Sequence, residues 1–112
     1  MVTINLVVLN GEKYIRHCLD AVLAQIYPHG NIEINILDNG SNDETISIIE
    51  NYKLKIKNSS FTRFNLIKNE QNLGMWGGQE ELLKHSAGEY IVMLSVDVIM
   101  DENFIFRSPA GP

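Results

Sequence analysis

The chain has 112 residues, a length that suits one small domain with a buried core. A hydrophobic content of 45% excludes a disordered or fibrous protein. The net charge of −5 argues against a protein that binds nucleic acid, because such a protein needs a basic surface.

The first half of the chain predicts two strands and the helix between them. A nearly continuous apolar run predicts a buried strand over Val2–Leu9. Apolar residues then recur every three or four positions, as on one face of a helix, and Pro28-His29-Gly30 ends that helix. These residues are Ile15, Cys18, Leu19, Val22 and Ile26. The second strand, Ile32–Leu37, alternates apolar and polar residues, so we expect it to have one wetter face.

A second helix is expected to open with Ser41-Asn42-Asp43-Glu44. This is a capping-box pattern, in which Ser41 and Glu44 each bond to the backbone amide of the other. The apolar stripe of this helix is predicted to consist of Ile46, Ile49 and Tyr52. The polar segment Lys53–Arg63 then predicts a surface loop or a frayed helix end.

The remaining strands are predicted at Asn65–Lys68 and Tyr90–Leu94, with a helix from about Trp76 to Ser86 between them. Trp76, Leu82 and Leu83 are expected to face inward. Residues 1–106 then form one α/β domain in the order β-α-β-α-β-α-β, with three α/β/α layers around a mostly parallel sheet. Residues 107–112 are expected to be a flexible tail.

Cysteine usage and the N-terminus bear on the cell compartment. The single cysteine, Cys18, excludes an internal disulfide, and its apolar neighbours predict a small core side chain. The N-terminus lacks the features of a signal peptide, and no apolar run is long enough to span a bilayer. We therefore expect a cytoplasmic protein, with membrane association only through other chains or missing segments.

Ligands of an open parallel sheet bind beyond the carboxyl ends of its strands. All four predicted strands are followed there by side chains with hydrogen-bonding capacity, and the first three also by glycine. The segments are Asn10-Gly11-Glu12, Asp38-Asn39-Gly40-Ser41, Asn69–Gly74 and Ser95-Val96-Asp97. We expect them to converge on one binding site.

Two carboxylates in these segments each have two interpretations. Asp38 can accept hydrogen bonds from a nucleobase or a ribose, or it can cap the following turn or helix. Asp97 closely follows a buried strand and suits a divalent cation, because Mg²⁺ and Mn²⁺ prefer carboxylate and phosphate oxygens. The alternative for Asp97 is a second capping residue. Neither a Walker A loop nor a Gly-x-Gly-x-x-Gly motif occurs.

Taken in order, the segments resemble glycosyltransferase family 2, whose inverting enzymes have the GT-A fold. The strongest segment is Ile36–Thr45, which matches the family pattern v-v-D-n-g-S-x-D-x-T almost throughout. Asn72-Leu73-Gly74 matches the family's N-x-G, and Ser95-Val96-Asp97 falls where the family carries its metal-binding D-x-D. Leu19–Pro28 and Ser86–Ile91 resemble two further family segments, so the resemblance covers Val2 to about Phe104.

The resemblance implies that the protein binds a UDP-, GDP- or dTDP-sugar and transfers the sugar, with inversion, to an unknown acceptor. Asp38 would contact the base or ribose, and Leu9 and Asn10 would border the nucleotide. Asp97 would bind the Mn²⁺ or Mg²⁺ that bridges the diphosphate. The full set of predicted nucleotide-sugar-binding residues is Leu9, Asn10, Glu12, Asp38, Asn39, Gly74, Ser95 and Asp97.

Three departures from the family qualify this expectation. Ser95 replaces the first aspartate of D-x-D, and Gln79 and Glu80 stand where the family often has arginine and asparagine. The family's general base lies beyond the length of this chain, so no catalytic residue is assigned and we expect the chain to be incomplete. The alternatives are an inactive sugar-donor-binding or structural half-domain and, with less support, another parallel α/β nucleotide binder.

The fourth strand also predicts a mode of assembly. Without further strands beside it, Tyr90–Leu94 would present an exposed sheet edge, which favours pairing with another chain. We therefore expect a homo-oligomer that forms through this edge.

Overall fold

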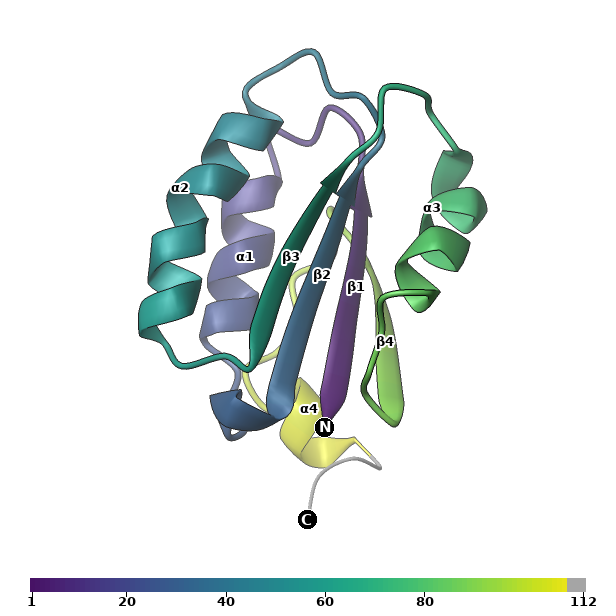
Figure 1. Cartoon of the computed structure of the whole chain (residues 1–112). Helices are drawn as coiled ribbons and strands as arrows, with labels where there is room; N and C mark the ends of the chain where they lie inside the picture. The colour runs from purple at the N-terminus through teal and green to yellow at the C-terminus, as the bar shows by residue number, and fades with distance from the viewer. Residues whose placement is uncertain (109–112) are drawn as a thin grey trace.

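The computed structural model describes residues 1–108 and shows three α/β/α layers around a parallel sheet (Figure 1). The sheet has four strands in the order β3-β2-β1-β4. All four predicted strands are confirmed, with ends within two residues of those expected. They are β1 (Val2–Val8), β2 (Ile32–Asp38), β3 (Arg63–Lys68) and β4 (Tyr90–Ser95).

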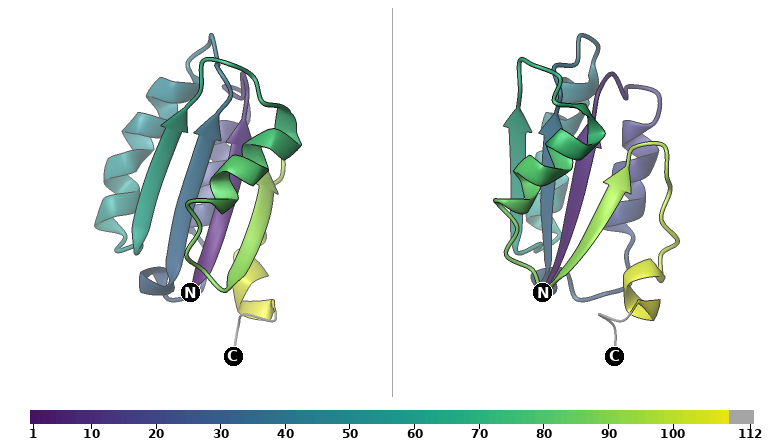
Figure 2. Two further views of the ribbon diagram at one scale, coloured as in Figure 1. Left: turned by 45° about the vertical axis from the view of Figure 1, so that its right-hand side comes forward. Right: turned by 90° about the vertical axis from the view of Figure 1, so that its right-hand side faces the viewer.

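Helices cover both faces of the sheet, as Figure 2 shows. Helices α1 (Ile15–Leu23) and α2 (Thr45–Asn58) lie on one face, and α3 (Gly74–Leu83) lies on the other. A 3-10 turn, η1 (His29–Asn31), precedes β2, and the short helix α4 (Phe104–Arg107) follows β4. The predicted α/β/α architecture is therefore confirmed, with a sheet that is parallel throughout.

The face under α1 and α2 is apolar and holds the main core. Ile4 and Leu6 of β1 and Ile34 and Ile36 of β2 are at most 1% exposed and pack in this core. Cys18 of α1 joins them, which confirms its predicted place in the core. Burial of this continuous apolar surface is the main source of the free energy that holds the three layers together.

The face under α3 carries more polar residues, and those of β1 and β2 are buried. Asn5, Asn35 and Asn65 are neighbours in the strand register. The side chain of Asn65 donates from Nδ2 to Asn35 Oδ1 at 2.8 Å, and that of Asn35 donates from Nδ2 to Asn5 Oδ1 at 3.1 Å. The expectation of a wetter face for β2 is wrong, because Glu33 and Asn35 are fully buried. The backbone amide of Ala87, beyond α3, donates to Glu33 and helps to close this face.

Two residues of α3 that were predicted to face inward are exposed instead. Trp76 is 74% exposed and Leu83 is 40% exposed, whereas Leu82 is buried as expected. The helix approaches the sheet through Gly78, where an added Cβ would lie 2.8 Å from Val7. Because this contact requires the smallest residue, the buried stripe is narrow and leaves the large side chains outside.

The predicted capping box does not form. Helix α2 begins only at Thr45, and the Ser41 hydroxyl donates to Asp38 while the Glu44 carboxylate accepts from the Ser47 hydroxyl. The Thr45 amide instead donates to Asp43. The capping positions are therefore displaced because Ser41 is used by the loop before the helix.

Three further boundaries differ from those expected. Ile26, predicted on the first helical stripe, lies beyond α1 and is 52% exposed. Helix α2 continues to Asn58, so the first part of the segment predicted as a surface loop or a frayed helix end is helical. Arg107 ends α4, whereas residues 109–112 of the predicted tail lie outside the described residues. Within residues 1–108, no helix has the length and apolar character needed to cross a membrane.

Candidate functional site

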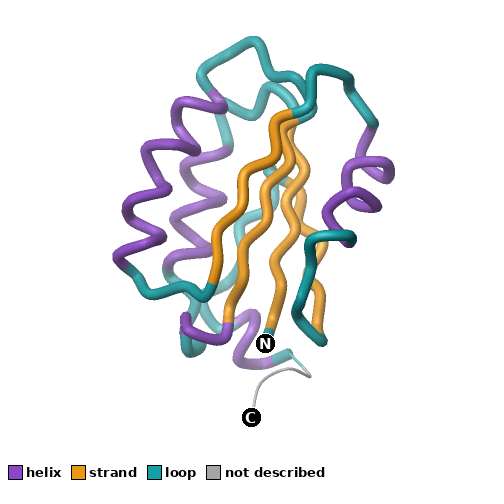
Figure 3. Tube along the Cα trace, viewed as in Figure 1, coloured by secondary structure: helices purple, strands orange, loops and turns teal. Residues whose placement is uncertain are grey.

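The carboxyl ends of the strands meet at one edge of the sheet. Val8 of β1 is the register partner of Asp38, and Val7 is the partner of Ser95. The loops that follow β1, β2 and β3 gather at the upper end of the molecule in Figure 3. The segments that begin with Asp38 and Ser95 therefore flank β1 at the same edge, as the sequence predicted.

Asp38 is fully buried and holds the start of the β2–α2 loop (residues 39–44). Its Oδ2 accepts from the amides of Gly40 at 3.1 Å and Ser41 at 2.9 Å. Its Oδ1 accepts from the Ser41 hydroxyl at 2.6 Å. Gly40 has a φ of +94°, a value that favours glycine and lets the chain turn back around the carboxylate.

The side-chain oxygens of Asn10 and Glu12 accept hydrogen bonds from the neighbouring loop. In the β1–α1 loop (residues 9–14), Asn10 Oδ1 accepts from the amide of Asn42 at 2.8 Å. Glu12 Oε1 accepts from the amide of Glu44 at 3.0 Å. These two side chains were predicted from sequence to contact the ligand, yet their oxygens hold the β2–α2 loop against the β1–α1 loop.

A second set of bonds runs in the opposite direction. The Asn10 amide donates to the Ser41 hydroxyl at 2.8 Å, and the Glu12 amide donates to Asp43 Oδ2 at 3.2 Å. Partial desolvation raises the pKa of Asp43, but hydrogen bonds from Thr45 and from the Glu12 amide outweigh this and hold its pKa below the ordinary value. The ionised form of Asp43 is therefore the one that ties the two loops together.

Asn39 joins the β3–α3 loop (residues 69–73) to the same edge. Its side chain is buried, with Oδ1 accepting from the Leu73 amide and Nδ2 donating to the Gly74 carbonyl, both at 3.2 Å. Gly74 has a φ of +74° and opens α3. Asn39 and Gly74, both predicted site residues, thus lie together and fix where α3 begins.

The segment after β4 also contributes an exposed carboxylate to this end of the sheet. The Ser95 hydroxyl donates to Asp97 Oδ1 at 2.7 Å, and Asp97 is exposed. Leu9 is also exposed, at 42%.

Burial and, to a lesser degree, the charge of Asp97 raise the pKa of Cys18 to about 12, so the thiol stays protonated and acts as a core side chain.

The donor set at Ser95 and Asp97 suits a cation that also has ligands from elsewhere. Residues 1–108 contain no group of three or more His, Cys, Asp or Glu side chains that could hold a metal ion. Mg²⁺ and Mn²⁺ are often held by one or two carboxylates together with phosphate oxygens of a substrate. One carboxylate and one hydroxyl fit that arrangement, and they do not fit a metal held by this chain alone.

Gln79 and Glu80, which stand where the family often has arginine and asparagine, differ in burial. Gln79 is 3% exposed, and its Nε2 donates to the Asn5 carbonyl at 3.2 Å under α3. Glu80 is exposed on α3. Sequence reasoning also missed the exposed apolar side chains Leu73, Met75 and Trp76 at the start of α3, because it placed Trp76 inward.

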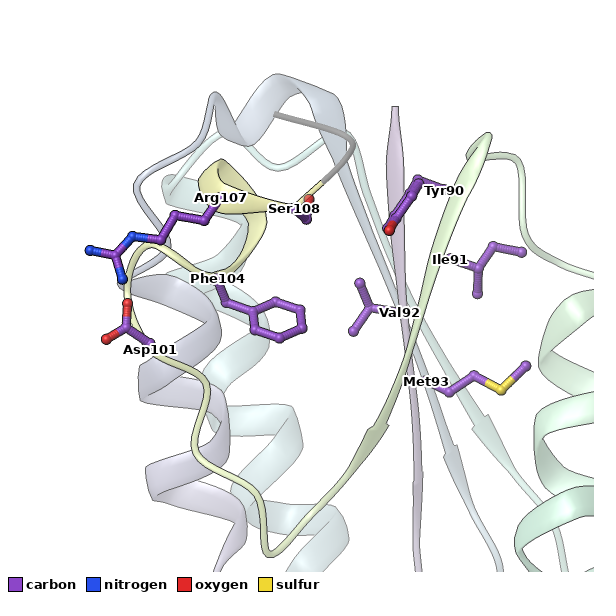
Figure 4. A pocket seen from close by; sticks show the side chains of 8 residues that line it. All are labelled: Tyr90, Ile91, Val92, Met93, Asp101, Phe104, Arg107 and Ser108. Carbon is purple, nitrogen blue, oxygen red and sulfur yellow. The ribbon is translucent and has the colours of Figure 1, made fainter. Parts of the chain in front are cut away.

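A hollow of about 700 Å³ beside β4 is separate from this edge (Figure 4). Tyr90, Val92 and Phe104 contribute apolar walls, and Asp101 and Arg107 contribute charges. It extends along the outer strand from Tyr90 to Met93 and does not include the loops around Asp38. It is therefore a feature of the open sheet edge and not part of the candidate site.

Comparison with known proteins gives a consistent family. The profile described as Glycosyl transferase family 2 matches residues 3–107. The chain is similar to the dolichyl N-acetyl-α-D-glucosaminyl phosphate 3-β-D-2,3-diacetamido-2,3-dideoxy-β-D-glucuronosyltransferase of Methanococcus voltae, with 28% identity over 86% of this chain and 29% of the relative. The chain thus spans less than a third of the length of that relative.

Solved structures show a similar fold. Staphylococcus aureus TarS in complex with UDP-GlcNAc matches with a TM-score of 0.82 and 23% identity, over 93% of this chain and 28% of that one. A mannosyltransferase of Pyrobaculum calidifontis in complex with GDP-Man and Mn²⁺ matches with a TM-score of 0.83 and 21% identity, over 96% and 32%. At these identities the likeness is one of fold.

Proposed function

The chain belongs to glycosyl transferase family 2, and from this premise we propose that it provides the part of a glycosyltransferase that binds a nucleoside-diphosphate sugar. The observation that carries the proposal is the convergence of the Asp38 and Asp97 segments on either side of β1. Two structural neighbours, one in complex with UDP-GlcNAc and the other with GDP-Man, support a donor of this class. UDP, GDP and dTDP all remain candidates for the nucleotide.

Asp97 is proposed to hold Mn²⁺ or Mg²⁺ together with the diphosphate. When bound, the cation supplies positive charge that stabilises the leaving diphosphate. The exposed carboxylate of Asp97 is free to reach such a cation, and the Ser95 hydroxyl keeps it oriented at 2.7 Å. One structural neighbour is in complex with Mn²⁺ as well as GDP-Man, which supports a divalent metal in this fold.

Leu9 and Asp38 are proposed to meet the nucleoside. Leu9 offers an exposed apolar surface to the base. Asp38 can bond a ribose hydroxyl or a base N–H only at Oδ1, whose bond comes from the Ser41 hydroxyl, since Oδ2 holds two backbone amides. Because Asp38 is fully buried, a ligand donor would have to replace the Ser41 hydroxyl, whose rotation would expose Oδ1.

Sugar transfer itself, with inversion, is proposed for a longer polypeptide that includes this part. The chain spans less than a third of the length of the Methanococcus voltae relative, and no general base is assigned to it, so we expect it to show no transfer activity alone. An inactive donor-binding or structural role for the chain is the alternative. The expected cytoplasmic location stays a prediction.

Titration calorimetry with UDP, GDP and dTDP, each with and without Mn²⁺, tests this proposal. We expect weak binding of one nucleotide that Mn²⁺ strengthens, and loss of the Mn²⁺ effect in Asp97→Asn. Glu89→Gln removes the same charge just before β4, at the opposite end of that strand, and should leave binding unchanged. If none of the three nucleotides produces a measurable heat of binding, the structural role is favoured.

The open edge of β4 supports a second copy of this chain as a partner. Tyr90–Ser95 contains no charged residue, and β4 is paired only with β1. A two-fold axis through Val92 would pair the two strands antiparallel, with Tyr90 opposite Leu94 and Ile91 opposite Met93. Light scattering should detect a dimer that Met93→Lys dissociates, and a monomeric wild-type chain at high concentration would refute this assembly.

A further inference from the structure

Thr45, the first residue of α2, directly follows the β2–α2 loop of the candidate donor site. Its side chain is fully buried. The hydroxyl oxygen accepts from the Gly11 amide at 2.9 Å, and the hydroxyl donates to Asp43 Oδ1. The Thr45 amide also donates to Asp43 Oδ1, at 3.0 Å. One threonine thereby connects the β1–α1 loop with the β2–α2 loop.

Burial separates this role from ligand binding. The Thr45 side chain is fully buried, and its hydroxyl already donates one bond and accepts another, so it has no free polar group to offer a nucleotide. Any influence of Thr45 on a ligand must therefore act through the backbone that it holds. Gly11, the residue whose amide it holds, is itself buried, so its N–H has no water to replace a lost partner.

Gly11 extends the connection to the segment that carries Asp97. A Cβ added at Gly11 would lie 2.6 Å from Val8 and 3.2 Å from Val96, so the glycine backbone packs directly against both. Val96 precedes Asp97 in the chain. A shift of Gly11 away from Thr45 would therefore change the packing at Val96 and the position of the Asp97 carboxylate relative to Asp38.

We propose that Thr45 is a positioning residue, which fixes the distance between the Asp38 loop and the Asp97 segment and so controls the affinity for a nucleoside diphosphate and its cation. This inference rests on the proposed function. The β1–α1 loop is the mediator, because it is bonded to Thr45 on one side and packed against Val96 on the other.

The test compares Thr45→Val with Thr45→Ser in the full chain. Valine has a similar shape but no hydroxyl, so the Gly11 amide loses its acceptor, whereas serine keeps it. We expect UDP in the presence of Mn²⁺ to bind about tenfold more weakly to Thr45→Val and with nearly unchanged affinity to Thr45→Ser. If UDP does not bind the wild-type chain, the nucleotide that does is the probe.

A control variant separates positioning from general stability. Ile49→Val removes one buried methyl group from α2 in the apolar core and should lower stability while leaving nucleotide affinity intact. If Ile49→Val weakens nucleotide binding as much as Thr45→Val does, the loss reflects stability and the positioning role is refuted. Equal affinity in Thr45→Val and the wild-type chain would refute it as well.

Hydrogen exchange provides a readout that does not depend on any ligand. In Thr45→Val without nucleotide, the amides of Gly11 and Glu12 should exchange faster, while those of Ile34 and Ile36 in β2 keep their protection. Unchanged exchange at Gly11 would overturn the claim that Thr45 holds this loop. If no nucleotide binds the wild-type chain, the proposed function and the effect on affinity fall together, and exchange alone decides whether Thr45 fixes the loop.

Discussion

The two faces of the sheet are built from different chemistry, although the residues of β1 and β2 are buried on both. The face under α1 and α2 is a continuous apolar core, whereas the buried apolar cluster under α3 consists, among residues 1–108, of Val7, Leu37 and Leu82. Most of the second face consists of paired polar side chains such as Asn5 and Asn35. An apolar core tolerates small shifts, but a buried polar network requires each partner in place. The first face therefore supplies stability, and the second enforces the strand register.

The largest expected effect comes from the apolar face. Ile34→Ala should lower the free energy of unfolding by about 2–5 kcal/mol, because it opens a cavity in a fully packed region. Urea denaturation measures the change. Ile91→Ala, the same substitution at a partly exposed site on the α3 face, is the matched comparison. An equal loss at both sites would contradict the assignment of stability to the first face.

A break in the asparagine ladder should have the next largest effect. Asn35→Leu leaves Asn5 Oδ1 without its donor and Asn65 Nδ2 without its acceptor, so we expect a loss of about 1–3 kcal/mol. The double variant with Asn5→Leu should cost less than the sum of the two single changes, because the broken bond is shared. Strict additivity in urea denaturation would show that the ladder does not act as a unit.

Tyr52 gives the apolar face a polar connection with its own pH dependence. Its hydroxyl donates to Asp20 at 2.7 Å, and burial followed by this bond raises the pKa of Tyr52 to about 12. The folded state thus favours the protonated phenol, so its contribution is complete below the unfolded pKa of about 10 and is lost as pH rises toward 12. Tyr52→Phe should cost about 0.5–1.5 kcal/mol at neutral pH and remove this alkaline decline in stability.

Alkaline denaturation curves of both proteins provide the check. The wild-type chain should lose more stability than Tyr52→Phe between pH 10 and 12. Parallel curves would show that the phenol of Tyr52 is not the group that titrates.

The smallest effect is expected at the surface of the first face. Lys68 of β3 pairs with Glu50 of α2 at 2.6 Å, with both side chains about half exposed. The hydrogen bond from Lys68 and then its charge hold the pKa of Glu50 below the ordinary value. In Lys68→Gln this pKa should return toward that value in an NMR titration, with little change in the urea midpoint. A large shift of the midpoint would mean that this pair contributes more than surface pairs usually do.

Much of the candidate site could be predicted from strand ends alone. The loops around Asp38 and Ser95 meet because parallel strands place their carboxyl ends at one edge. The use of each side chain could not be predicted in the same way. Asn10 and Glu12 carry oxygens suited to a ligand, but the loop opposite offers them the backbone amides of Asn42 and Glu44. From sequence alone, the importance of Thr45 was indicated only by its place as the last residue of the segment that resembles the family pattern.

Local sequence fixed what depends on neighbouring residues: the four strands, the helices between them and the order of the layers. Tertiary structure decided what depends on contacts between distant segments. It buried the polar residues of β2 under α3, turned Trp76 outward because Gly78 allows close approach, and used Ser41 to hold a loop instead of a helix. The physical reason is that a buried polar group takes whichever partner the fold brings within hydrogen-bond distance, and sequence spacing alone does not identify that partner.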